Sequence, residues 1–177
     1  MPIYEFEEKR PTISASAFVH PEAVVIGDVI IGENCYIAPG AVLRGDWGAV
    51  RVGDGSNVQE NCILHAGPDA VVSLGPECHV GHGAIVHEAT LGSHVLVGMG
   101  AIIQDRAQIG EGCIIGSGCL ILSDTNIPAR KMVVGVPGQI ITDVTDEREK
   151  YSWHGTRLYQ SLPARYHKAF REIKPDY

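Results

Sequence analysis

Residues 91–133 read LGSHVLVGMGAIIQDRAQIGEGCIIGSGCLILSDTNIPARKMV, with an aliphatic residue at every sixth position. These positions are Leu91, Val97, Ile103, Ile109, Ile115, Ile121, Ile127 and Val133. The same period runs through residues 19–43, and it continues in shifted register as Val52, Val58, Leu64 and then Leu74, Val80, Val86. Amphipathic helices and isolated strands have periods of about 3.6 and 2, so neither explains it. The repeat predicts a triangular parallel β-helix with about three six-residue sides per coil.

Small residues accompany the repeat. Glycine supplies 21 of 177 residues and often directly follows the aliphatic position, where we expect it to ease the tight corners. Only 6% of the residues are aromatic, so the core must consist of Val, Ile, Leu, Ala and Cys. The five cysteines each lie four positions after a repeat aliphatic, and they are Cys35, Cys62, Cys78, Cys113 and Cys119. We expect them to be small buried thiols, because their number is odd and no C-x-x-C pair occurs.

The composition excludes several classes of partner. Lys and Arg number 14 against 21 Asp and Glu, a formal charge of −7, which argues against nucleic acid or an anionic membrane surface. No apolar window is long enough to span a membrane, and the N-terminal residues lack the pattern of a secretory signal. We therefore expect a cytoplasmic protein.

The repeat ends near Gly138, and the composition then becomes charged and polar. The sequence predicts a β-helix domain over residues 1–141, with a lead-in of 1–17, and a helical segment over 142–177. Asp143 or Thr145 could cap the first helix, and Pro163 should interrupt it. We expect this segment to lie along the outside of the β-helix.

Counting repeats places Leu43, Leu64 and Val86 on one side of successive coils. The residues that follow them, Arg44, His65 and His87, should therefore form an outward column at the strand spacing of about 4.8 Å. The same count places Gln59 and His82 together on the preceding side, facing outward, so His82 lies around a corner from the other two histidines. We predict that His65 and His87 bind one metal ion together with His82 of a neighbouring copy, in a homotrimer.

Three imidazoles leave one tetrahedral position open to water, as in catalytic zinc sites. Zn2+ is the expected ion, and Fe2+ or Co2+ would accept the same ligands. We expect the remaining histidines to have no ligand role; they are His20, His79, His94, His154 and His167.

Several segments resemble the γ-class carbonic anhydrase family of left-handed β-helix trimers. They are Arg44-Gly45-Asp46, residues 57–61 (NVQEN), Leu64-His65 and residues 81–87 (GHGAIVH). The similarity spans about residues 18–138 and is greatest to the branch encoded in phenylacetate and carnitine operons. The resemblance implies left-handed coils, and it implies that the three histidines bind zinc across a subunit boundary.

The resemblance also implies roles for other residues. Arg44, Asp46 and Glu60 would form salt bridges between subunits, and Gln59 would orient the metal-bound hydroxide or the substrate. Tyr159 matches a helical tyrosine that approaches the metal in some members. The chain departs from the family at Glu60, where Asp is usual, and at Trp47, where the archetype has Glu. The loop 66–68 also lacks the glutamate that shuttles protons in the archetype.

Four functions remain open at this point. The first is reversible hydration of CO2 by a metal-bound hydroxide, and the second is hydrolysis of an acyl-CoA thioester at the same metal. The third is an acyltransferase that uses one histidine as general base and needs no metal. The fourth is a trimeric scaffold whose metal is structural. Three histidines in one constellation favour the first two, because a general base requires only one.

Overall fold

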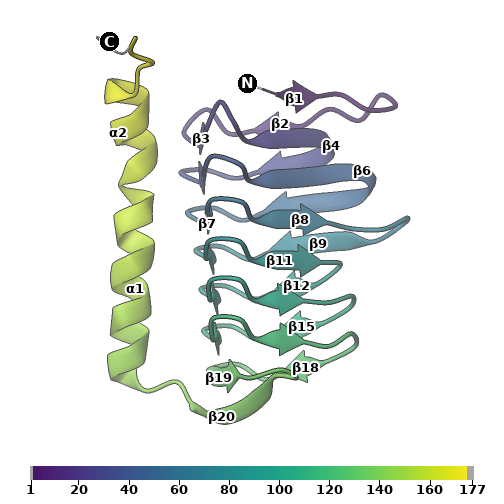
Figure 1. Ribbon diagram of the computed structural model, residues 1–177, viewed down its shortest axis with the longest axis vertical. Helices are drawn as coiled ribbons and strands as arrows, with labels where there is room; N and C mark the ends of the chain where they lie inside the picture. Colours follow the sequence, from purple (N-terminus) through teal and green to yellow (C-terminus); the bar gives the residue numbers. More distant parts are fainter. Residues whose placement is uncertain (1, 175–177) are drawn as a thin grey trace.

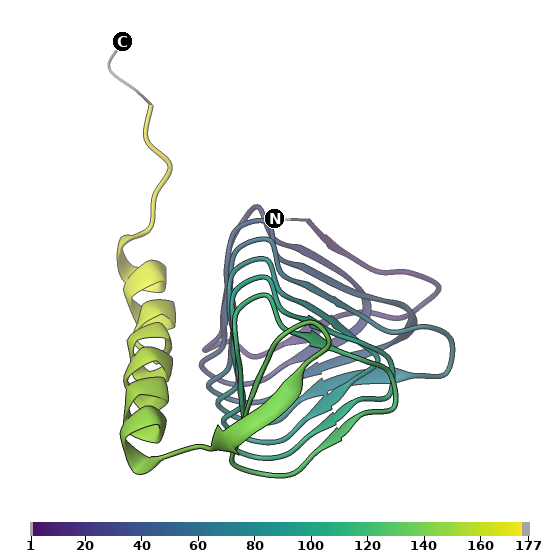
Figure 2. The ribbon, with the colours of Figure 1, turned by 60° about the horizontal axis from the view of Figure 1, so that its bottom comes forward.

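The structure, a computed structural model, describes residues 2–174 and is the parallel β-helix that the repeat predicts, left-handed as the resemblance implies, with two helices alongside it (Figure 1). Viewed obliquely from one end, the stacked coils have a triangular outline (Figure 2). Twenty strands form two sheets. The twelve-stranded sheet contains β1 (Ile3–Tyr4), β2 (Thr12–Ile13), β4 (Val24–Ile31), β6 (Val42–Val52), β8 (Ile63–His65), β9 (Val71–Leu74), β11 (Ile85–His87), β12 (Thr90–Leu91), β14 (Ile102–Ile103), β15 (Gln108–Ile109), β17 (Leu120–Ile121) and β18 (Asn126–Ile127). The eight-stranded sheet contains β3 (Phe18–Val19), β5 (Tyr36–Ile37), β7 (Asn57–Val58), β10 (His79–Val80), β13 (Leu96–Val97), β16 (Ile114–Ile115), β19 (Lys131–Val134) and β20 (Gln139–Asp143).

The three sides of the prism follow from the strand pairing. The first part of β6 pairs with β8, and its second part pairs with β9, so the larger sheet bends around a corner and supplies two sides. The smaller sheet supplies the third side. All of its pairings are parallel except that of β19 with β20.

The repeat aliphatics fill the interior. Leu43 lies in register with Leu64, and Leu64 with Val86, and all three side chains are fully buried. Burying each such side chain contributes about 1.5–3 kcal/mol. All five cysteines are buried and free, as predicted. The larger rings lie outside the prism, where Phe18 and Tyr36 pack against the C-terminal helices.

The glycines that follow the repeat aliphatics have a different role from the one we expected. Gly98 has no positive φ; a Cβ there would lie 2.7 Å from the backbone carbon of Gly116 in the next coil. These glycines therefore allow close stacking of the coils. The left-handed conformation occurs two residues later, as at Gly100 with a φ of +66°.

Helices α1 (Asp146–Gln160) and α2 (Leu162–Ala169) run along the third side (Figure 1). The Thr145 side chain caps α1 by accepting from the Arg148 backbone N–H, and Pro163 occupies the first turn of α2. The break between the two helices therefore falls next to Pro163. Neither helix has the length and apolar character needed to cross a bilayer.

Candidate metal site

His65 and His87 lie next to each other on adjacent coils. Arg44 of β6, His65 of β8 and His87 of β11 are in register, so their side chains form one outward column. The Nδ1 of His65 is 3.0 Å from the Nε2 of His87. Two nitrogens bound to one tetrahedral zinc are about 3.3 Å apart, given Zn–N distances of about 2.0–2.1 Å. The two rings therefore already have nearly the spacing of a shared ion.

Each ring also has a carboxylate on its other side. The Nδ1 of His87 lies 2.6 Å from Asp105 Oδ1. The Nε2 of His65 lies 3.3 Å from Asp46 Oδ1, but the geometry falls short of a hydrogen bond, and this buried nitrogen has no hydrogen-bond partner within residues 2–174. Carboxylates behind imidazoles are common at metal sites, where they fix the tautomer of the ligand.

The number of ring protons on His65, compared with the acceptors around it, shows whether a cation fits between the two rings. His65 is 7% exposed, and burial, followed by the charges of Arg44 and His87, lowers its pKa and favours the neutral ring. When His87 donates its Nδ1 proton to Asp105, its Nε2 presents a lone pair to His65. A neutral His65 has one proton for two acceptors, His87 Nε2 and Asp46 Oδ1. An ion between the rings removes this conflict, so the residues present fit a metal.

Asp46 is held by the chain around it. Arg44 donates to Asp46 Oδ2 at 2.7 Å, and the Trp47 backbone N–H donates to Asp46 Oδ1. Burial opposes ionisation of Asp46, but the hydrogen bonds from Arg44 and the Trp47 backbone and the charge of Arg44 together outweigh it and keep the pKa of the carboxyl below its usual value. Lys9 of the lead-in donates to the Asp46 carbonyl oxygen at 2.9 Å. Arg44 and Asp46 thus pair within one chain.

His82 lies in the corner before β11, at the opposite end of that side from His87. Its Nδ1 is 2.5 Å from Glu60 Oε2, and its side chain is 47% exposed. Among the described residues, the one group of three or more metal-type ligands with atoms within 4.8 Å of each other is His87, Glu88 and Asp105, which includes neither His65 nor His82. Within residues 2–174, His65, His82 and His87 are the histidines with a carboxylate close to a ring nitrogen.

Gln59 projects outward from its coil, as expected, but α1 covers it and it is not exposed beside His82. Gln59 is 1% exposed beneath α1, and its Nε2 contacts Asn57 and His79. The neighbour of His82 is Glu60, because the corner at Glu60 lies directly beside the corner at residues 82–83 on the next coil. Tyr159 of α1 packs edge-on against His79, with the ring centroids 5.1 Å apart. Burial raises the pKa of Tyr159.

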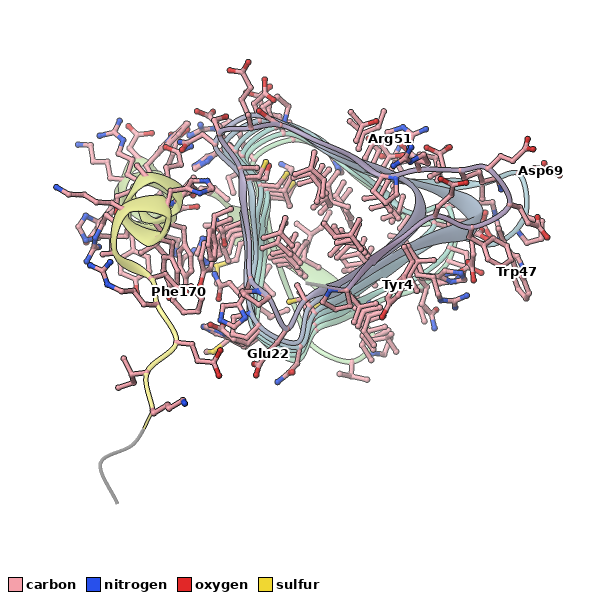
Figure 3. All side chains as sticks on the ribbon, turned by 90° about the horizontal axis from the view of Figure 1, so that it is seen from above. Tyr4, Glu22, Trp47, Arg51, Asp69 and Phe170 are labelled. Atoms are coloured by element: carbon pink, nitrogen blue, oxygen red, sulfur yellow. The ribbon has the colours of Figure 1, made fainter. Side chains whose placement is uncertain are left out.

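Several contributors to this site were not singled out from the sequence. Asp105 and Glu88 lie around His87, and the Glu88 carboxylate accepts from the Gly67 backbone N–H at 2.9 Å. Val86 pairs with Ile103, so this coil has 17 residues instead of 18. The same 17-residue shift places Asp105 beside Glu88, and the shortened spacing in the sequence could have predicted it. Trp47, noted above only as a departure from the family pattern, is 61% exposed, and its ring lies 6.2 Å from that of His65. Figure 3 shows Trp47 projecting from the corner of the prism farthest from the helices.

The geometry defines a class: a hexapeptide-repeat β-helix with a surface histidine cluster. Residues 10–45 and 88–123 match the family model described as bacterial transferase hexapeptide (six repeats). The chain is 39% identical over 175 residues to the carnitine operon protein CaiE of Escherichia coli K12, covering 99% of this chain and 89% of that protein. It is 40% identical to CaiE of Salmonella agona, with 99% and 88% coverage.

The protein belongs to this hexapeptide-repeat family, together with the CaiE proteins. Two solved structures support the assignment. A candidate acetyltransferase, the BC4754 product of Bacillus cereus, is similar with a TM-score of 0.92 and 36% identity, covering 94% of this chain and 96% of that one. A hexapeptide transferase family protein from Anaplasma phagocytophilum is similar with a TM-score of 0.89 and 33% identity, covering 93% of this chain and 98% of that one.

Proposed function

We propose that this protein is a metal-dependent enzyme of the γ-class carbonic anhydrase type, which hydrates CO2 reversibly at a site shared by two chains of a homotrimer. The observation that carries the proposal is the pair of facing nitrogens of His65 and His87, 3.0 Å apart, together with their carboxylate partners. His82 has the same character, because Glu60 occupies its Nδ1 and leaves Nε2 available.

The ion is held, in this proposal, by His65 and His87 of one copy and by His82 of the next. Zn2+ is the ion proposed, with Fe2+ or Co2+ as substitutes. When bound, such an ion supplies a water molecule acidified to a pKa near 7. Gln59 and Tyr159 both contact His79, three residues before His82, so they would come from the same copy as His82.

A surface for the neighbouring copy exists beside the histidines. One apolar residue per coil points outward from the same side, in register from β4 to β17; this apolar column consists of Val24, Val42, Ile63, Ile85, Ile102 and Leu120. Ile63 and Ile102 are each 40% exposed in the single chain. A continuous apolar stripe of this kind is typical of a subunit interface.

Hydrolysis of acyl-CoA thioesters by the same residues is the second candidate. Trp47 favours it, because an exposed ring next to His65 offers an apolar wall that a substrate as small as CO2 does not need. Acyl transfer is the third candidate. The description of the family as transferases supports it, and it would need no metal.

Metal analysis of protein purified without an affinity tag separates these candidates. We expect about one ion per chain, whereas fewer than about 0.3 would contradict both metal-dependent proposals. Stopped-flow CO2 hydration and a thiol-release assay with a panel of acyl-CoA esters then distinguish the two substrates.

The shared site is tested by mixing inactive variants. His65→Ala and His82→Ala should each abolish activity, because each removes one ligand from every site. Trimers reassembled from equal amounts of both should regain about one quarter of full activity, since a site is intact only where a His82→Ala chain meets a His65→Ala chain in the right order. The matched control mixes His65→Ala with His87→Ala, which remove ligands from the same half and should recover nothing. Recovery in the control, or none in the test mixture, would contradict the cross-chain site.

A further inference from the structure

Three polar side chains form a closed cluster between the β-helix and α1. His79 of β10 lies in register with Asn57 of β7, and Gln59 is the next residue of that coil to point the same way. The Nε2 of Gln59 is 2.7 Å from His79 Nε2 and 2.9 Å from Asn57 Oδ1. Asn57 and Gln59 are each 1% exposed. The proposed reaction uses Gln59 but assigns nothing to His79.

The hydrogens of Gln59 determine the role of His79. Its Nε2 has two, and Asn57 Oδ1 accepts one of them. The other points at His79 Nε2, which must therefore present a lone pair. The proton of a neutral His79 then lies on Nδ1. Asn57 Nδ2 is 3.3 Å from this atom, so in this tautomer two donors face each other and make no hydrogen bond.

His79 is in the state that this role requires. A charged imidazole has no lone pair and could not accept from Gln59. Burial, followed by the charges of His82 and His94, lowers the pKa of His79 to about 4. The edge-on ring of Tyr159 closes the cluster from the side of α1.

The second polar atom of Gln59 is free. Its Oε1 accepts no hydrogen bond within the described residues, yet it is not among their buried atoms that lack a partner, which belong to His65 and His94. The small exposed part of Gln59 therefore includes this oxygen. Gln59 directly precedes Glu60, the partner of His82, in the chain.

We propose that His79 is a positioning residue for Gln59. By accepting from Gln59 Nε2, it holds the amide with the carbonyl Oε1 turned out toward the His82 corner, so Gln59 accepts a hydrogen bond from a reacting water or hydroxyl group instead of donating one to substrate. The identity of that reacting group rests on the proposed function, whereas the orientation of the amide does not.

Nuclear magnetic resonance of the full-length protein, with 15N-labelled histidine and glutamine, tests this directly. At pH 7 the proton of His79 should lie on Nδ1, and the Gln59 side-chain hydrogens should exchange slowly with solvent. His79→Ala should speed that exchange at least about tenfold. His79→Gln, whose carbonyl can accept from Gln59, should restore part of the protection.

His94→Leu is the matched control, because His94 also packs beneath α1, stacked on Trp153, and its ring nitrogens make no hydrogen bond to Gln59 or to any other described residue. It should leave Gln59 exchange unchanged. A proton on His79 Nε2, or unchanged Gln59 exchange in His79→Ala, overturns the proposal. Equally fast Gln59 exchange in His94→Leu also overturns it, because the faster exchange would then come from loosening of α1.

Turnover forms a separate arm of the test. His79→Ala should keep its metal content and its KM while kcat falls about tenfold, as expected when only orientation is lost. Loss of metal in this variant would overturn the positioning role. If the wild type has no activity in any assay but the Gln59 results hold, the proposed function fails and the role of His79 in setting the amide stands.

Discussion

Single residues show how neighbouring coils can adapt one side-chain type to different tasks. His65 and His87 face each other with carboxylates behind them, whereas His79 faces two amides beneath a helix. The first environment leaves ring nitrogens free for a ligand. In the second, the Gln59 amide occupies Nε2 of His79, and burial is the main cause of the lowered pKa of this ring. The partners of each ring, more than the histidine itself, determine its chemistry.

The low pKa of His79 predicts a loss of stability in acid. An unfolded chain takes up this proton near the ordinary histidine pKa of about 6.5, while the folded chain does so only at about 4. The contribution of neutral His79 to the free energy of unfolding is therefore complete above about pH 6.5. It is lost as the pH falls toward 4, by up to about 3 kcal/mol. Urea unfolding of metal-free wild type and His79→Gln at pH 7 and 4.5 should show a smaller loss in the variant. His154→Gln, on the exposed surface of α1, is the control and should lose as much stability as the wild type. Equal losses in wild type and His79→Gln would contradict the assignment of this acid sensitivity to His79.

The two kinds of glycine predict different costs of substitution. Gly98→Ala places a Cβ 2.7 Å from the Gly116 backbone carbon, and the backbone can relieve this overlap only by separating two coils. We expect a loss of about 2–3 kcal/mol or more. Gly100→Ala meets open space and adds only the strain of its left-handed φ, about 1–2 kcal/mol. Thermal unfolding of both variants shows which one loses more stability. If Gly98→Ala were more stable than Gly100→Ala, the close-stacking explanation would be refuted.

At the scale of elements, α1 is the part that the repeat does not determine. It covers Asn57, Gln59 and His79 with a face that contributes few large apolar side chains, and the Thr145 cap fixes where it begins. The helix therefore excludes water from a polar cluster more than it adds apolar burial. This arrangement links the C-terminal segment to the candidate site.

The helix contains a glycine that is open to improvement. Gly155 lies inside α1, and a Cβ there would be 3.7 Å from the His79 ring, an ordinary contact. Gly155→Ala should therefore stabilise the protein by about 0.5–1 kcal/mol through helix propensity and reduced unfolded-state entropy. Denaturant unfolding measures the change, and a loss of stability would mean that α1 packs more tightly on His79 than this distance indicates.

At the scale of the whole molecule, the three sides of the prism have different characters. One is covered by α1 and α2, and another presents polar residues such as Arg51, Ser73 and Thr90 in register. The third carries the apolar column beside His65 and His87. The side with the proposed ligands is thus also the side best suited to contact another copy.

Disrupting the apolar column should therefore remove the metal without touching a ligand. Ile102→Glu places a charge in the proposed interface, and we expect a folded protein of monomer size with most of its metal and activity lost. Thr90→Glu, on the polar side, should leave assembly and metal content unchanged. Light scattering with metal analysis checks both, and a trimeric, metal-loaded Ile102→Glu protein would place the interface elsewhere.

The sequence by itself determined the solenoid, its six-residue sides, the buried cysteines and the register of Arg44, His65 and His87. A periodic pattern could do this because each coil repeats the same local rule and pairs with its neighbour. Only the tertiary structure decided that Gln59 is buried against His79, that Glu60 partners His82, and that Asp105 supports His87. These contacts depend on which side α1 covers and on coils that depart from 18 residues, and both arise from packing between distant segments, which the repeat does not specify.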